Sequence, residues 1–118
     1  MIFYTEQTTQ ILDINKAVER DLDGNLVIHS SGQALGVVMS SYQVPDSDPV
    51  TYESKIYVAG GGGQDMVLGA AWNGILTRFE FQNGQAVPVS SGGDGWLVPE
   101  FPVASKVSGD VVQGAIYK

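Results

Sequence analysis

The sequence has no cysteine and only one histidine, His29, and these two scarcities remove most metal and nucleophile chemistry. Without cysteine, disulfide scaffolds, thiol nucleophiles and thiolate zinc sites are excluded. A multi-histidine metal site or a Ser–His–Asp triad would have His29 as its single possible anchor. We therefore predict that the protein is not an enzyme, with no catalytic residues, no metal ion and no cofactor.

Basic residues are also scarce: six lysines and arginines stand against thirteen acids, which gives a net charge of −7. Nucleic-acid-binding proteins neutralise phosphates with clustered lysine and arginine, and anionic lipid surfaces attract the same residues. The composition therefore predicts no nucleic-acid partner and no membrane partner. Long apolar runs are missing too, since the longest fall far short of the ~20 residues that cross a bilayer. The N-terminus lacks the features of a secretory signal, so we expect a protein made and used in a cytoplasm, or carried out by something larger.

What the sequence does contain is glycine and apolar residues in the length of one domain. It has 118 residues, 43% of them hydrophobic, and fifteen are glycine, which is about twice the average usage. Turn signals recur every 8–12 residues along most of the chain, a spacing typical of antiparallel barrels and sandwiches. We therefore predict an all-β fold, a small antiparallel barrel or sandwich.

Two Asn-Gly pairs are the strongest turn signals, because a type I′ hairpin turn needs φ > 0 at both central positions. Asn73-Gly74 and Asn83-Gly84 are predicted to join three strands into a meander, with Pro88 marking an edge strand. The strands predicted along the chain cover residues 26–29, 34–42, 52–59, 66–72, 75–81, 85–89, 96–98 and 111–117.

The N-terminal residues are the ambiguous part of the sequence. Ile11, Ile14, Val18 and Leu22 are spaced three, four and four residues apart, as on a helix, whereas Asp13 and Asn15 disfavour a helix interior. Residues 11–20 are thus left open between a short helix and a strand. We predict an extended N-terminal arm over residues 1–10 and a single β domain over residues 11–118.

Three sets of acidic residues carry weak ligand signals. Residues 21–25 (DLDGN) resemble half of a calcium loop, but the position of the bidentate glutamate is occupied by Ser30, so a plain turn is favoured. Asp46 and Asp48 in the next loop are interpreted as solvated acids. Asp94 and Glu100 flank Trp96, but a domain of this size can hardly spare the cleft that glycoside hydrolysis needs.

The glycine run and the tryptophans are the remaining candidates for binding. The run at residues 60–63 has no Lys-Ser/Thr pair after it, so it is either a flexible hairpin tip or a tip that lies flat on another protein. Trp72 and Trp96 could stack on sugars or could belong to the core. Sequence alone leaves both pairs of alternatives open.

Three segments resemble the small head decoration (cement) proteins of tailed bacteriophages. They are residues 18–28 (VERDLDGNLVI), 32–38 (GQALGVV) and 106–116 (KVSGDVVQGAI), which together cover part of the chain. The resemblance implies an all-β protein that binds the outside of a capsid shell, clamps neighbouring major capsid subunits and often forms trimers. It carries no catalytic residues with it.

We therefore expect a capsid decoration protein at the virion surface, assembled in the host cytoplasm, whose partners are the major capsid protein and itself as a homotrimer. The alternative is a virion fibre or carbohydrate-binding β module. Deleting residues 1–8 is expected to abolish capsid attachment while leaving the melting temperature nearly unchanged. The residues predicted to form the capsid or subunit interface are Ile2, Phe3, Tyr4, Gly60, Gly61, Gly62, Gly63 and Trp96.

Overall fold

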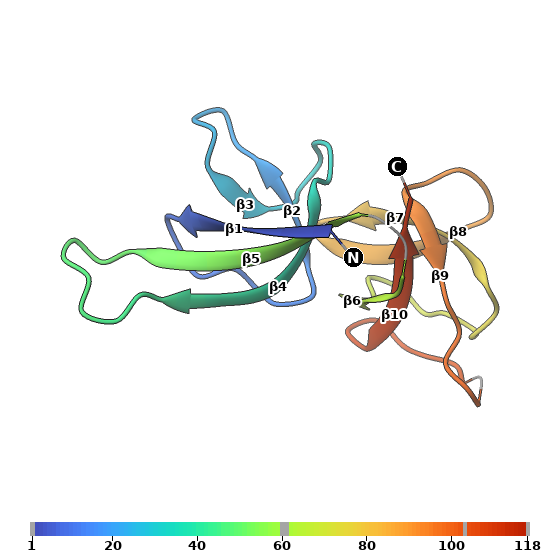
Figure 1. The fold of residues 1–118 in the computed structure, drawn as a ribbon. Helices are drawn as coiled ribbons and strands as arrows, with labels where there is room; N and C mark the ends of the chain where they lie inside the picture. The colour runs from blue at the N-terminus through green and yellow to red at the C-terminus, as the bar shows by residue number, and fades with distance from the viewer. Residues whose placement is uncertain (1, 60–61, 103, 118) are drawn as a thin grey trace.

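Two antiparallel β-sheets of five strands each make up the protein in a computed structural model, which describes residues 2–59, 62–102 and 104–117 (Figure 1). The first sheet has the order β1-β5-β4-β2-β3 and the second the order β6-β10-β9-β7-β8. The strands of the first sheet are β1 (Ile2–Thr8), β2 (Ala17–Arg20), β3 (Leu26–Ile28), β4 (Gly36–Gln43) and β5 (Tyr52–Ala59). Those of the second are β6 (Gln64–Val67), β7 (Thr77–Gln82), β8 (Gln85–Val89), β9 (Gly95–Leu97) and β10 (Val111–Ile116). The predicted all-β fold is confirmed.

No helix occurs in the described part of the chain, and so none is long and apolar enough to cross a membrane. The short helix considered for residues 11–20 is therefore wrong, because Ala17–Arg20 is strand β2. Asn15 has a φ of 69°, which breaks a right-handed helix at this point. The apolar residues with helical spacing also do not share one buried face, since Val18 is buried whereas Ile11 and Ile14 are exposed.

The two Asn-Gly pairs behave differently. Asn83 and Gly84 both have positive φ, 51° and 77°, and they join β7 to β8 in the predicted hairpin. At the other pair only Gly74 has a positive φ, and the predicted hairpin there is wrong, because β6 pairs with β10 while β7 pairs with β8 and β9. The indole of Trp72 donates to the Ile75 carbonyl at 2.9 Å, so this turn folds around the ring. The predicted meander is thus reduced to one hairpin, with Pro88 in edge strand β8 as expected.

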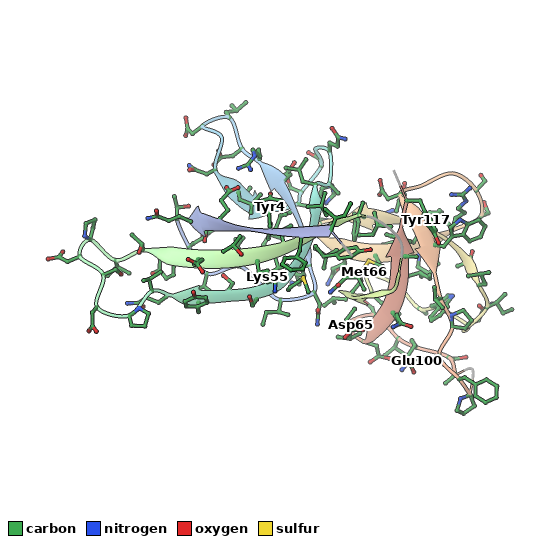
Figure 2. The ribbon with its side chains drawn as sticks, in the orientation of Figure 1. Tyr4, Lys55, Asp65, Met66, Glu100 and Tyr117 are labelled. Carbon is green, nitrogen blue, oxygen red and sulfur yellow. The ribbon has the colours of Figure 1, made fainter. Side chains whose placement is uncertain are left out.

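The first sheet buries apolar side chains on both faces. Neighbouring residues of one strand point to opposite sides, and in β4 and β5 this separates Val37 and Tyr57 from Val38 and Ile56. Val37 and Tyr57 pack with side chains of the second sheet, among them Met66, whose position between the sheets is marked in Figure 2. The other face closes over a smaller core made of Leu12, Val18, Leu26, Val38 and Ile56, with Tyr4, Ile28 and Leu35 packed against it.

Hydrogen bonds fasten the β7–β8 turn of the second sheet to the first sheet. The N–H of Ala17 donates to the Gly84 carbonyl at 2.7 Å, and the N–H of Gly84 donates to Nδ1 of His29 at 3.1 Å. Nε2 of His29 lies 2.9 Å from the Gly32 carbonyl. Both ring nitrogens of the buried side chain thus have a backbone partner. His29 is thus a structural link between the two sheets.

The N-terminal segment is extended, as predicted, but it is not a free arm. Residues 2–8 pair with β5 along their whole length, from Ile2 opposite Ala59 to Thr8 opposite Tyr52. Tyr4 packs against the smaller core, and the Thr8 hydroxyl lies 3.2 Å from that of Ser54. The segment is ordered because strand pairing satisfies its backbone while Tyr4 and Thr8 anchor it from one side. β1 is therefore an edge strand of the domain.

Deleting residues 1–8 should accordingly lower the free energy of unfolding by ~1.5 kcal/mol or more, because the packing of Tyr4, the contact of Thr8 with Ser54 and the pairing with β5 are all lost. This replaces the expectation of an unchanged melting temperature. Urea denaturation monitored by tryptophan fluorescence measures the change. The control is the double variant Ile2→Ser/Phe3→Ser, which removes exposed side chains of β1 and the cation–π contact between Phe3 and Lys55. It should lower the free energy of unfolding by no more than ~1 kcal/mol. A deletion variant as stable as the parent would show that β1 is a free arm after all.

Candidate binding surfaces

Strand β1 carries the first three residues that the sequence predicts for an interface. Ile2 is 59% exposed and Phe3 49% exposed, so both side chains are available to a partner. Nζ of Lys55, on neighbouring strand β5, lies 4.0 Å from the centre of the Phe3 ring, a cation–π contact (Lys55 is labelled in Figure 2). Tyr4 points the other way and is half-buried, and this burial raises the pKa of its hydroxyl. β1 therefore offers Ile2 and Phe3 to a partner, but not Tyr4.

The glycine run connects the two sheets. Gly60 and Gly61 lie outside the described residues, while Gly62 has a φ of +81° and its carbonyl accepts a hydrogen bond from the Tyr57 hydroxyl at 3.4 Å. β5, before the run, belongs to the first sheet, and β6, after it, belongs to the second. The interpretation of the run as a hairpin tip is thus wrong. A side chain at Gly63 would collide with Gln113, so glycine lets the crossing pass close to β10.

The two tryptophans have different surroundings. Trp72 is 4% exposed and belongs to the core shared by the two sheets, with its indole N–H bound to the Ile75 carbonyl. Trp96 is half-buried on β9, and the guanidinium of Arg78 lies 4.3 Å from its ring centre. Neither ring stands free as a flat platform, since Trp72 is enclosed and Arg78 covers one face of Trp96.

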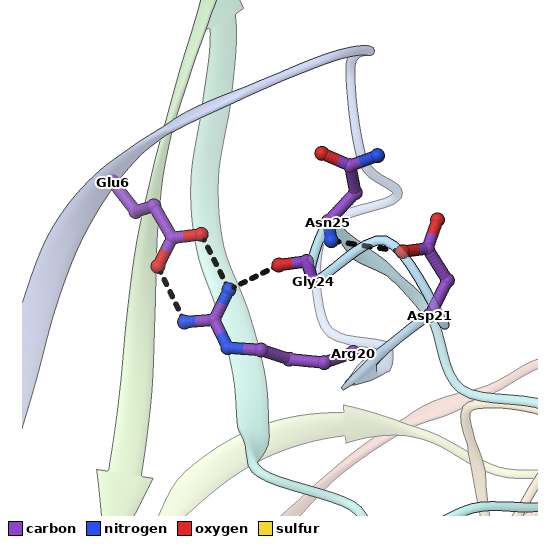
Figure 3. A network of polar contacts seen from close by, with 5 residues as sticks. All are labelled: Glu6, Arg20, Asp21, Gly24 and Asn25. Carbon is purple, nitrogen blue, oxygen red and sulfur yellow. Dashed lines mark hydrogen bonds and ion pairs between the residues drawn. The ribbon is translucent and has the colours of Figure 1, made fainter.

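Three of the acidic residues that the sequence singled out, Asp21, Asp94 and Glu100, make local contacts. Oδ1 of Asp21 accepts from the N–H groups of Asp23 at 3.0 Å and Asn25 at 2.8 Å, which closes the β2–β3 turn (Figure 3). Oδ2 of Asp94 accepts from the Phe81 N–H at 2.7 Å, and Glu100 pairs with Lys106 at 2.9 Å. No group of three or more histidine, cysteine, aspartate or glutamate side chains within the described ranges could hold a metal ion.

Arg20 ties the β2–β3 hairpin to β1, at the opposite edge of the first sheet. Its guanidinium binds both carboxylate oxygens of Glu6, at 2.8 and 2.7 Å, and also donates to the Gly24 carbonyl at 3.0 Å (Figure 3). β1 and β2 are separated by β5 and β4 in the strand order. The ion pair can form only because the sheet curls around its smaller core. Hydrogen bonding to Arg20 lowers the pKa of Glu6.

Glu19 holds the loop that follows β3. Its carboxylate accepts hydrogen bonds from the hydroxyl and the N–H of Ser30 and from the N–H of Gly32. These contacts, with the Ser30 hydroxyl contributing most, lower the pKa of Glu19 from an ordinary value of 4.5 to about 2. A side chain at position 32 would collide with the carboxylate, so the loop needs glycine there. The arrangement fixes the loop between Ser30 and Gly32 against β2.

Sequence reasoning missed an apolar groove on the second sheet. It has a volume of about 680 Å³ and runs between the 72–77 segment, the end of β8 and residues 105–107. Ile75, Leu76 and Val107 line it and are 55–64% exposed. The pair Ile75-Leu76 could have indicated this groove. In a strand with one solvated face, two consecutive apolar residues place one apolar side chain on the exposed side.

Comparison with known protein families and with curated protein sequences gives no significant match.

The Glu19 carboxylate predicts a specific acid sensitivity. Because its pKa is lower in the folded chain, it stabilises the fold above pH 4.5, and this contribution is lost as the pH falls from 4.5 toward 2. Glu19→Gln should therefore be less stable than the parent at pH 7, and the difference should shrink as the pH approaches 2. Chemical denaturation at a series of pH values tests this, and a difference that does not change with pH would contradict it.

The tryptophans predict a contrast in stability. Trp72→Ala should cost about 3–5 kcal/mol, the usual range for removing a buried tryptophan, because the ring is enclosed in the shared core. Trp96→Ala should cost clearly less, since that ring is only half-buried. Denaturation curves of the two variants measure the difference. Equal losses would mean that Trp96 is as much a core residue as Trp72.

Proposed function

We propose that this chain is a capsid decoration protein, which binds the outside of a phage head and stabilises it by bridging major capsid subunits. The observation that carries the proposal is the separation of exposed apolar surfaces on one elongated body. A protein that bridges two subunits needs at least two binding surfaces, far enough apart to reach both. The proposal places the protein on the virion surface, after assembly in the host cytoplasm.

The body measures 47 × 28 × 24 Å, and the β4–β5 hairpin projects to one end while the second sheet lies at the other (Figure 1). The hairpin carries Tyr42, 46% exposed, and Val50, 54% exposed. The second sheet carries the groove with Ile75 and Leu76. Apolar anchors of this kind supply most of the energy of a protein interface.

The edge of the first sheet adds a third surface. β1 pairs on one side with β5, and Ile2 and Phe3 are exposed on it. An exposed edge strand can extend the sheet of a neighbouring protein through backbone hydrogen bonds. These surfaces would be repeated over every subunit of a shell, so modest contacts add up to strong attachment.

The carboxylates and tryptophans support a binding role over chemistry or sugar recognition. Asp94 and Glu100 are engaged with Phe81 and Lys106 instead of facing each other across a cleft. Trp72 is buried, and Arg78 covers one face of Trp96. What the described surface offers a partner is apolar side chains around fixed loops, which suits another protein.

The experiment adds the purified chain to shells assembled from the major capsid protein encoded nearest to this gene. We expect saturable, stoichiometric decoration in cryo-electron micrographs and a raised melting temperature of the shells. The double variant Tyr42→Ser/Val50→Ser is altered at the hairpin end only. It should still bind shells, but the shells should lose most of the rise in melting temperature, because the variant contacts a capsid subunit at its other end alone. Leu22→Ser, which removes an exposed side chain at the β2–β3 turn, is the matched control. Binding to a glycan array without any decoration of shells would overturn the proposal in favour of a carbohydrate-binding module.

A further inference from the structure

A loop between β9 and β10 presents one aromatic side chain entirely to solvent. Phe101 is 100% exposed and is flanked by Pro99 and Pro102. The loop projects from the second sheet at the lower right of Figure 1, and Glu100, labelled in Figure 2, lies on it. An aromatic side chain held in water by a proline-rich loop contributes nothing to the core of its own chain.

The base of this loop is firmly attached. The Val98 N–H donates to the Gln113 carbonyl at 3.0 Å, and Nζ of Lys106 pairs with Glu100 at 2.9 Å. Lys106 and Trp72 also exchange two backbone hydrogen bonds, at 2.8 and 3.0 Å. Phe101 therefore extends from a fixed base, which lowers the entropy lost when a partner binds it.

The apolar groove lies next to this loop. Residues 105–107, a few positions after Phe101, form one of its walls, while Ile75, Leu76 and Pro88 line it elsewhere. Phe101 does not fill the groove of its own chain, because its side chain is fully exposed. One molecule thus carries an unfilled apolar groove and an unburied aromatic side chain on neighbouring surfaces.

The charge distribution leaves these surfaces open to a second copy of the chain. The chain has a net charge of −7, so two copies repel each other over most orientations. Among the described residues that line the groove, Lys106 alone is charged, and Glu100 neutralises it. Phe101 and the prolines beside it carry no charge. The groove and the loop are therefore places where two copies of this acidic chain can meet without bringing unpaired carboxylates together.

We propose that Phe101 of one copy inserts into the groove of a second copy, where it packs against Ile75, Leu76 and Val107. Each copy has both a loop and a groove, so the contact can be repeated until a closed ring forms. This inference deepens the proposed function, since it names the surface through which copies associate on a shell, where a ring of three is expected. It can nevertheless be tested without any capsid.

The contact is expected to be weak between molecules free in solution. One aromatic side chain buries about 150–250 Å², well below the ~1,200 Å² of a stable interface. The association should therefore depend on concentration and appear as a monomer in equilibrium with a larger species. A shell would favour it further by holding copies at high local concentration.

Sedimentation velocity over a range of concentrations is the first test. Phe101→Ala should weaken association by about tenfold or more, the loss typical of removing a well-packed interface aromatic. The matched control is Leu22→Ala, because Leu22 is just as exposed but lies on the β2–β3 turn of the other sheet. Circular dichroism should show both variants folded, since neither side chain is buried. Equal association of the parent, Phe101→Ala and Leu22→Ala would overturn the inference.

The absence of cysteine allows a second, positional test. Ala104, the site of one cysteine, is three positions after Phe101 in the sequence, and Ser90, the site of the other, lines the groove. Both positions are exposed. Two differently tagged chains carrying one cysteine each should be joined by a short bis-maleimide. Adding Phe101→Ala to the Ala104→Cys chain should reduce this cross-linking about tenfold. Replacing Ser90→Cys by Leu22→Cys should reduce it equally.

The outcomes separate this inference from the proposed function. Cross-linking that ignores Phe101→Ala would overturn the insertion of Phe101, whether or not shells are decorated. Loss of shell binding by Phe101→Ala without any change in self-association would mean that Phe101 contacts the capsid protein and not a second copy, which also overturns it. A dimer formed through Phe101 and the groove would support the inference but contradict the threefold part of the proposed function.

Discussion

The burial of the first sheet on both faces is the constraint on which the rest of the structure depends. Its strands carry pairs of consecutive apolar residues, such as Ala17-Val18 and Val37-Val38, and the two members of each pair point to opposite sides. One face needs the second sheet as cover, while the other is covered by the curling of the sheet over itself. The second sheet and the curling of the first sheet are thus both needed to keep these side chains out of water. The separation into a shared core and a smaller core follows directly.

This arrangement also explains why one end of the molecule projects. Beyond Val38 and Ile56, strands β4 and β5 carry Ser40, Ser41 and Lys55, which need no apolar cover. The hairpin therefore extends past both cores and turns at residues 44–51 (Figure 1). There the Ser47 hydroxyl closes the loop by donating to the Val44 carbonyl and accepting from the Thr51 N–H. A projecting hairpin at one end and a groove at the other make the body suited to contact two neighbours.

The excess of acids has a structural use in the loops. Four carboxylates accept hydrogen bonds from backbone N–H groups that have no partner in a neighbouring strand. They are those of Glu19, Asp21, Asp94 and Asp110. A carboxylate is a strong acceptor for such groups, and the bonds also lower the pKa of Glu19. Part of the net charge of −7 therefore comes from residues that fix the backbone of loops and strand ends. The same charge limits the surfaces at which copies of the chain can approach one another.

The sequence by itself determined the all-β class, most strand positions and the Asn83-Gly84 hairpin, because alternation and positive-φ turns are local properties of the backbone. It could not decide that Asn73-Gly74 would fold around Trp72, or that residues 1–8 would pair with β5, because those outcomes depend on partners distant in sequence. The same holds for the candidate surfaces: Ile2 and Phe3 were found as apolar residues near an end. The groove was not found, since it forms only where residues 72–77, 88–90 and 105–107 meet. Local turns and strands follow from neighbouring residues, whereas pairing, burial and grooves are decided by which strands the tertiary structure brings together.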